Sequence, residues 1–155
     1  MTAEWSRIVD ALERHGTLVR VSVAALAGSA PREVGAALVL RPDGAFWGTI
    51  GGGALEWRAL ALARRALADP AAGFALAEIV LGPDLGQCCG GRVTLAVERL
   101  DAANLPDTRA LAAAETDGTA LVLARRHDGR LVRALLPDAP VALGLARDGD
   151  LIERI

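Results

Sequence analysis

Residues 36–68 read AALVLRPDGAFWGTIGGGALEWRALALARRALA and contain the change of pattern that decides the fold. Two short apolar segments, 36–41 and 45–47, flank the turn sequence Pro-Asp-Gly, and this arrangement predicts a β-hairpin. After the glycines, apolar residues recur at a period near 3.6 over residues 54–68, which predicts an amphipathic helix. The stretch therefore predicts paired strands followed directly by a helix.

The same two periods extend to both sides of this stretch. Helical spacing predicts a first helix over residues 3–15, which Gly16 ends. Segments rich in β-branched residues predict strands at 17–27, 74–81 and 92–100. Beyond residue 100 we expect a helix at 108–115, a hairpin of strands 119–126 and 131–136, and a strand at 141–145. Helices are too few to cover both faces of a doubly wound sheet, so we expect an α/β (α+β) fold in which a mixed or antiparallel sheet carries a few packed helices.

The composition fits one compact unit without covalent cross-links. The chain has 155 residues, 52% of them hydrophobic, and a chain of this length buries roughly 70% of its unfolded surface. Cys88 and Cys89 are the only cysteines and are adjacent, so no internal disulfide joins distant segments. We expect residues 1–100 to form one domain and residues 101–155 to continue the same unit.

Charge and hydropathy exclude two classes of partner. The formal net charge is -2 and the charges are scattered, so the basic stripe that binds nucleic acid is missing. No apolar run approaches the ~20 residues that span a bilayer. The N-terminus carries acidic residues instead of the basic and apolar regions of a signal peptide. We therefore expect a cytoplasmic protein that contacts neither nucleic acid nor membrane.

A glycine-rich segment, Gly48-Thr49-Ile50-Gly51-Gly52-Gly53, leaves a predicted strand and enters a predicted helix. Glycines let a ligand approach the main chain, and the free N–H groups at a helix start favour an anion. The segment has neither the GxGxxG nor the GxxxxGK[ST] spacing of nucleotide-binding loops. An ordinary strand-to-helix turn is the alternative interpretation.

The loop Gly28-Ser29-Ala30-Pro31-Arg32-Glu33-Val34-Gly35 joins two predicted strands. Arg32 has a planar guanidinium suited to phosphate or carboxylate, and Ser29 adds a hydroxyl. Pro31 restrains the loop. The alternative interpretation is a surface loop with one solvated Arg–Glu pair.

The third segment, Gly86-Gln87-Cys88-Cys89-Gly90-Gly91, places adjacent cysteines between glycines on a predicted loop. This context suits reactive sulfur better than core packing. A zinc site is not expected, because ligands at the usual spacing are missing and His15 and His127 lie in unrelated segments.

These three segments, GSAPREVGA, GTIGGGALE and LGPDLGQCCGG, occur in an order and spacing that resemble the xanthine dehydrogenase accessory protein family (XdhC/CoxI) over Thr17 to Leu100. The resemblance implies that residues 1–100 form a cofactor-handling domain. It also implies a chaperone, not an enzyme, that binds molybdenum cofactor (molybdopterin) as cargo. Such a protein aids sulfuration of the cofactor and its insertion into apo-xanthine dehydrogenase or a related molybdenum hydroxylase. Members typically continue into a Rossmann-like domain, which we expect this chain to lack.

The resemblance and the residue chemistry together give a candidate site. The terminal phosphate of the cofactor is expected at Gly51 to Gly53, near Arg32, and a sulfur contact to molybdenum is expected from Cys88 or Cys89. Partners implied by the resemblance are a xanthine dehydrogenase-type apoenzyme, a cysteine desulfurase and a second copy of the chain. The candidate cofactor-binding residues are Ser29, Arg32, Gly51, Gly52, Gly53, Gln87, Cys88 and Cys89.

Two other functions remain open at this point. One is a thiol enzyme with Cys89 as nucleophile and Glu33 or Glu56 as proton carrier. The other is a docking module for the target enzyme that binds no cofactor.

Overall fold

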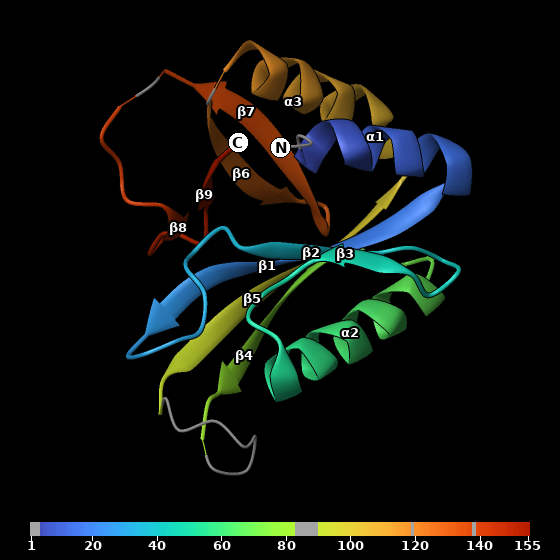
Figure 1. The fold of residues 1–155 in the computed structure, drawn as a ribbon. Coiled ribbons are helices and arrows are strands. Elements are labelled where there is room, and N and C mark those ends of the chain that lie inside the picture. The colour runs from blue at the N-terminus through green and yellow to red at the C-terminus, as the bar shows by residue number, and fades with distance from the viewer. Residues whose placement is uncertain (1–3, 83–89, 119, 138) are drawn as a thin grey trace.

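The computed structural model describes residues 4–82, 90–118, 120–137 and 139–155, which form two antiparallel sheets and three helices (Figure 1). The helices are α1 (Glu4–His15), α2 (Gly53–Ala68) and α3 (Leu105–Asp117), the last preceded by a 3-10 helix at Ala102–Asn104. The strands are β1 (Thr17–Ala27), β2 (Ala37–Leu40), β3 (Phe46–Gly48), β4 (Phe74–Val80), β5 (Arg92–Asp101), β6 (Leu121–His127), β7 (Arg130–Leu136), β8 (Gly144–Leu145) and β9 (Leu151–Arg154).

The strands pair in the order β3-β2-β1-β5-β4 in the first sheet and β7-β6-β9-β8 in the second. Each of these strand pairs is antiparallel. The predicted α+β class with an antiparallel sheet is therefore confirmed.

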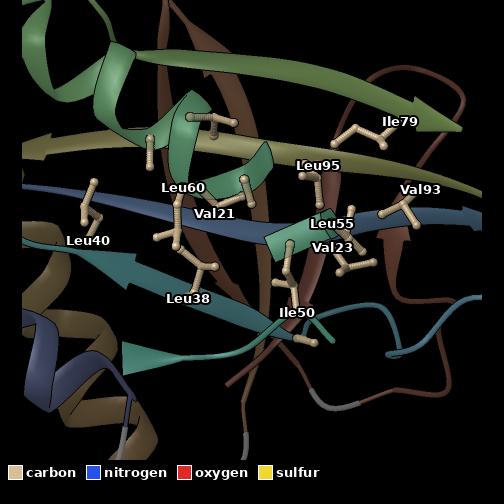
Figure 2. Close-up of a cluster of buried hydrophobic side chains, with 14 of the residues drawn as sticks. Val21, Val23, Leu38, Leu40, Ile50, Leu55, Leu60, Ile79, Val93 and Leu95 are labelled. Carbon is tan, nitrogen blue, oxygen red and sulfur yellow. The ribbon is translucent and has the colours of Figure 1, made fainter. Parts of the chain in front are cut away.

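Helix α2 covers one face of the first sheet (Figure 1). Its buried residues Leu55 and Leu60 lie among Val21, Val23 and Leu38 of the strands (Figure 2). Alternation along β1 and β2 directs these valines and leucines to the same face. The apolar face of α2 and the apolar face of the first sheet thus pack together in one core.

The opposite face of the first sheet carries α1 and the second sheet (Figure 1). Trp5 and Ile8 of α1 are fully buried there with Val39 of β2, Leu111 of α3 and Val122 of β6. Successive side chains of β2 point to opposite faces of the sheet. Leu38 packs in the core under α2 and Val39 in the core under α1, so this short strand contributes to both.

A buried network of charges joins the two sheets. Arg20 of β1 donates to Glu153 of β9 (Nη1–Oε1, 2.6 Å), and Arg133 of β7 donates both to Glu153 (Nε–Oε2, 3.1 Å) and to Glu98 of β5 (Nη2–Oε2, 2.6 Å). The guanidinium carbons of Arg20 and Arg133 lie 5.1 and 4.9 Å from the centre of the Trp5 ring. Burial raises the pKa of Glu153, but the two arginines outweigh it and lower the pKa to about 2.

The C-terminal elements differ most from the sequence-based expectation. Helix α3 begins at Leu105, before the expected 108. A capping box of Asp101 and Asn104 starts the 3-10 helix, which leads directly into α3, and a proline follows in the first turn of α3. Strand β8 is limited to Gly144–Leu145, and β9 was not predicted. The sequence Leu-Ile-Glu-Arg lacks the usual strand pattern, since it buries a glutamate whose partners lie on other strands.

Candidate functional site

The glycine turn and the 28–35 loop are in direct contact. Gly51 has a φ of +123°, and a Cβ atom placed on it would lie 2.6 Å from Cγ of Pro31. Any larger residue would therefore collide with the proline ring and adopt a strained backbone. The two predicted segments meet because glycine permits this close approach.

The segment that follows the cysteines reaches the same loop. Gly90 forms a parallel β-bridge with Ser29. A Cβ atom on Gly91 would lie 2.0 Å from the carbonyl oxygen of Ser29, so the two backbones are packed without room for a side chain. Gln87, Cys88 and Cys89 themselves lie outside the described residues.

The main-chain donors of the glycine turn already have an anionic partner within the chain. Oε2 of Glu56 accepts from Thr49 Oγ1 (2.6 Å), from the N–H of Ile50 (3.2 Å) and from the N–H of Gly52 (3.3 Å). The N–H of Gly51 donates to Thr49 Oγ1 at 3.1 Å. A ligand anion at this turn would compete with the Glu56 carboxylate for two of its amides, so the expected phosphate position at Gly51 to Gly53 stays a prediction.

Arg32 forms the ion pair that the alternative interpretation of its loop expected. Its Nε and Nη2 donate to the Glu33 carboxylate at 3.0 and 2.9 Å. This bidentate hydrogen bonding lowers the pKa of Glu33 to about 2 and raises that of Arg32. The side chain of Arg32 is 37% exposed, so its remaining donors are within reach of a ligand. Ser29 is also exposed.

A cleft of about 580 Å³ lies beside this loop. It is lined by Ala37 and Val39 of β2, by Trp47 of β3, and by residues of α1, the 32–36 segment and β9. Arg32 lines the cleft, whereas Ser29 and the three glycines do not. Gly53 instead borders a smaller hollow of about 200 Å³ beside the exposed Trp57 of α2. The remaining lining residues of the larger cleft are Glu4, Arg7, Val23, Glu33, Val34, Gly35, Ala36, Gly48, Thr49, Leu143, Leu151, Ile152, Glu153 and Arg154.

Sequence reasoning missed Arg7 and Trp47. The guanidinium carbon of Arg7 lies 4.5 Å from the centre of the Trp47 ring, and both residues line the cleft. One residue belongs to α1 and the other to β3, and neither lies in a recognisable motif. Only the packing of α1 on the first sheet brings them together.

The part of the chain that the structure describes has neither a metal-binding cluster nor a helix that could span a membrane. No group of three or more His, Cys, Asp or Glu side chains there could hold a metal ion. None of the described helices has the length and apolar character needed to cross a membrane. The possible sulfur contact from Cys88 or Cys89 falls outside these residues and stays a prediction.

Comparison with known proteins bears on both the fold and the motifs. The chain resembles a solved structure from Bacillus halodurans described as a xanthine dehydrogenase, with a TM-score of 0.69 and 19% sequence identity. The aligned part covers 90% of this chain and 44% of that one, so this chain spans less than half of that relative, and the likeness concerns the fold. No curated protein matches this chain. Residues 11–80, which include two of the three motifs, match the family model described as the XdhC and CoxI family, and the family resemblance predicted from the sequence is thereby confirmed.

Proposed function

We propose that this chain binds molybdenum cofactor (molybdopterin) as cargo and takes part in the maturation of a xanthine dehydrogenase-type enzyme. In this proposal it assists sulfuration of the cofactor and its insertion into the apoenzyme. The observation that carries the proposal is that the 28–35 loop contacts both the glycine turn and the two glycines that follow the cysteines. Gly51 packs on Pro31, and Gly90 is bridged to Ser29.

The chemistry of these segments suits the two ends of such a cargo. Molybdopterin carries a terminal phosphate, and Arg32 offers planar N–H donors to an oxyanion. At the other end, thiolates are good ligands for the softer transition metals. Cys89 is bonded to Gly90, and Gly90 contacts the loop that holds Arg32. The neighbouring cleft of about 580 Å³ is within the range of small-molecule sites, roughly 300–1,000 Å³.

The same geometry supports an accessory role over a thiol enzyme. A proton carrier works best when its pKa lies near the working pH. Glu33 has a pKa of about 2 because Arg32 binds its carboxylate, so it is a weak base at neutral pH. Glu56 is bound by the turn at Ile50 and Gly52, where it organises the backbone.

The partners and location follow the same proposal. The recipient is a xanthine dehydrogenase-type apoenzyme in the cytoplasm. A cysteine desulfurase supplies the sulfur, and a second copy of the chain is a further partner.

Metal and pterin analysis of the chain after mixing with molybdenum cofactor and gel filtration tests the proposal directly. We expect molybdenum and pterin to co-elute with the protein in equal amounts. The double variant C88S/C89S should lose them, while a G82A control should retain them because no atom of the described residues lies within 4 Å of a Cβ at Gly82.

Three outcomes would count against the proposal. Retention by the double variant would remove the role of the cysteines. Binding by neither protein would favour the docking module. Turnover of an electrophilic substrate without molybdenum would favour the thiol enzyme.

A further inference from the structure

The cleft beside the 28–35 loop contains a cation outside all three motifs. Arg7 lies on α1 and lines the cleft with Arg32, yet among the described residues it forms no ion pair. Its contact is the face of Trp47, where the guanidinium carbon lies 4.5 Å from the ring centre. Because the five N–H donors of arginine lie in the plane of the guanidinium, stacking uses its face and leaves these donors available.

The carboxylates that line the cleft, by contrast, already have arginine partners. Glu4 and Glu153 accept from Arg20 at 2.8 and 2.6 Å. Glu33 accepts from Arg32 at 2.9 Å. The positive charge of Arg7 is therefore not offset by a neighbouring acid, and an oxyanion entering the cleft would meet carboxylates that are already neutralised.

Main-chain N–H groups at the N-termini of α1 and α2 could also bind an anion near the cleft, but several of them already donate to carboxylates of this chain. The N–H groups of Glu4 and Trp5, at the start of α1, donate to the carboxylate of Glu115 at 2.8 and 2.9 Å. Those of Ile50 and Gly52, at the start of α2, donate to Glu56. An anion in this region thus depends on side-chain cations more than on main-chain N–H groups.

We propose that Arg7, stacked on Trp47, binds the phosphate group of a phosphorylated small molecule in this cleft. The proposal rests on the proposed function for the identity of that molecule. Its phosphate would then lie at Arg7, in place of the position near Arg32 and Gly51 to Gly53, and Arg32 would contact another part of the ligand. Arg7 meets Trp47 opposite Val39, whereas Arg32 lies in the loop that enters β2 at Ala37. Both arginines line the cleft, so the rest of the ligand would extend from Arg7 toward Arg32.

Binding of inorganic phosphate, measured by calorimetry at constant ionic strength, tests the role of Arg7 without the cofactor. R7A should weaken binding about tenfold to a hundredfold, since a charged hydrogen bond contributes about 1.5–3 kcal/mol. The matched control is R14A, which removes the same charge from an exposed position two turns along the same face of α1. Both side chains are exposed, so both variants should keep the unfolding temperature of the wild type.

The outcomes separate this inference from the proposed function. Equal phosphate affinity in R7A and the wild type, or no measurable binding by the wild type, overturns the role of Arg7. Competition between phosphate and molybdenum cofactor on the wild type, weakened in R7A, identifies the cofactor as the source of the phosphate. Arg7-dependent phosphate binding in a protein that retains no molybdenum upholds the cleft and refutes the proposed function. If the protein retains molybdenum and R7A binds phosphate as tightly as the wild type, the proposed function is upheld and the role of Arg7 is refuted.

Discussion

Substitution of Gly91 by alanine tests whether the segment after the cysteines packs against the 28–35 loop. An alanine there would place its Cβ 2.0 Å from the carbonyl oxygen of Ser29 and 3.0 Å from that of Ala27. Both atoms belong to the main chain, so rotation of a side chain cannot relieve the collision. The 28–35 loop and the segment at Gly90 must move apart.

The expected loss of stability follows from the cost of overpacking, which is about 1–3 kcal/mol. We expect the upper part of this range, because the bridge between Ser29 and Gly90 is lost as well. For a chain of this length each 1 kcal/mol lowers the unfolding temperature by roughly 2–4 °C, which gives a fall of about 4–12 °C in G91A. Retention of molybdenum cofactor should fall with it.

Urea unfolding followed by circular dichroism measures the change, with G82A as the control. Gly82 lies just before the cysteine segment, and a Cβ there meets no atom of the described part of the chain within 4 Å. G82A should therefore unfold near the wild-type midpoint. If G91A is as stable as G82A, the two backbones are not in contact and the argument for a shared site fails.

Three further predictions concern the charged groups. The variant E153Q should lose about 1.5–3 kcal/mol of stability in urea unfolding, because Arg20 and Arg133 would each lose a charged hydrogen bond to Glu153 and keep only their second carboxylate, Glu4 and Glu98 respectively; a loss below 1 kcal/mol would show that the network is solvated. Because the pKa of Glu153 is lowered from 4.5 to about 2 on folding, its contribution to stability is fully present above about pH 4.5 and is lost as the pH falls toward 2, and a stability profile that stays flat across this window would contradict the assignment. The variant E56A should cost about 1 kcal/mol by leaving the glycine turn without its acceptor, as urea unfolding can measure; wild-type stability would mean that water replaces the carboxylate.

Local patterns were sufficient to predict much of the first sheet. The strand at residues 17–27 and the helix ending at residue 68 match β1 and α2, because apolar periodicity there coincides with burial. Strand β9 could not be predicted, since its stability depends on partners of Glu153 that lie more than a hundred residues away or on another strand of the second sheet. The apolar pattern of residues 151–154 alone does not indicate that Glu153 has such partners.

The candidate site likewise has a part that could be predicted from local motifs and a part that could not. The motifs identified Arg32 and the glycine turn. Gly51 packs against the Pro31 ring and Gly91 against the backbone of Ser29, and a Cβ would not fit at either position. The contact of Arg7 with Trp47 arises from the packing of a helix on a sheet. No spacing rule along the chain encodes it.

The charge network also determines how the chain can be divided. Arg20 and Glu98 belong to the first sheet, and their partners Glu153 and Arg133 belong to the second. A fragment that ends after β5 would remove one counter-charge from each of Arg20 and Glu98, and it would expose to solvent a face of the sheet that is buried in the intact chain, Trp5 included. The first and second sheets should consequently unfold in a single transition. A shortened chain that keeps all three motifs would still lack Glu153 and Arg133, the buried partners of Arg20 and Glu98 in the central strands.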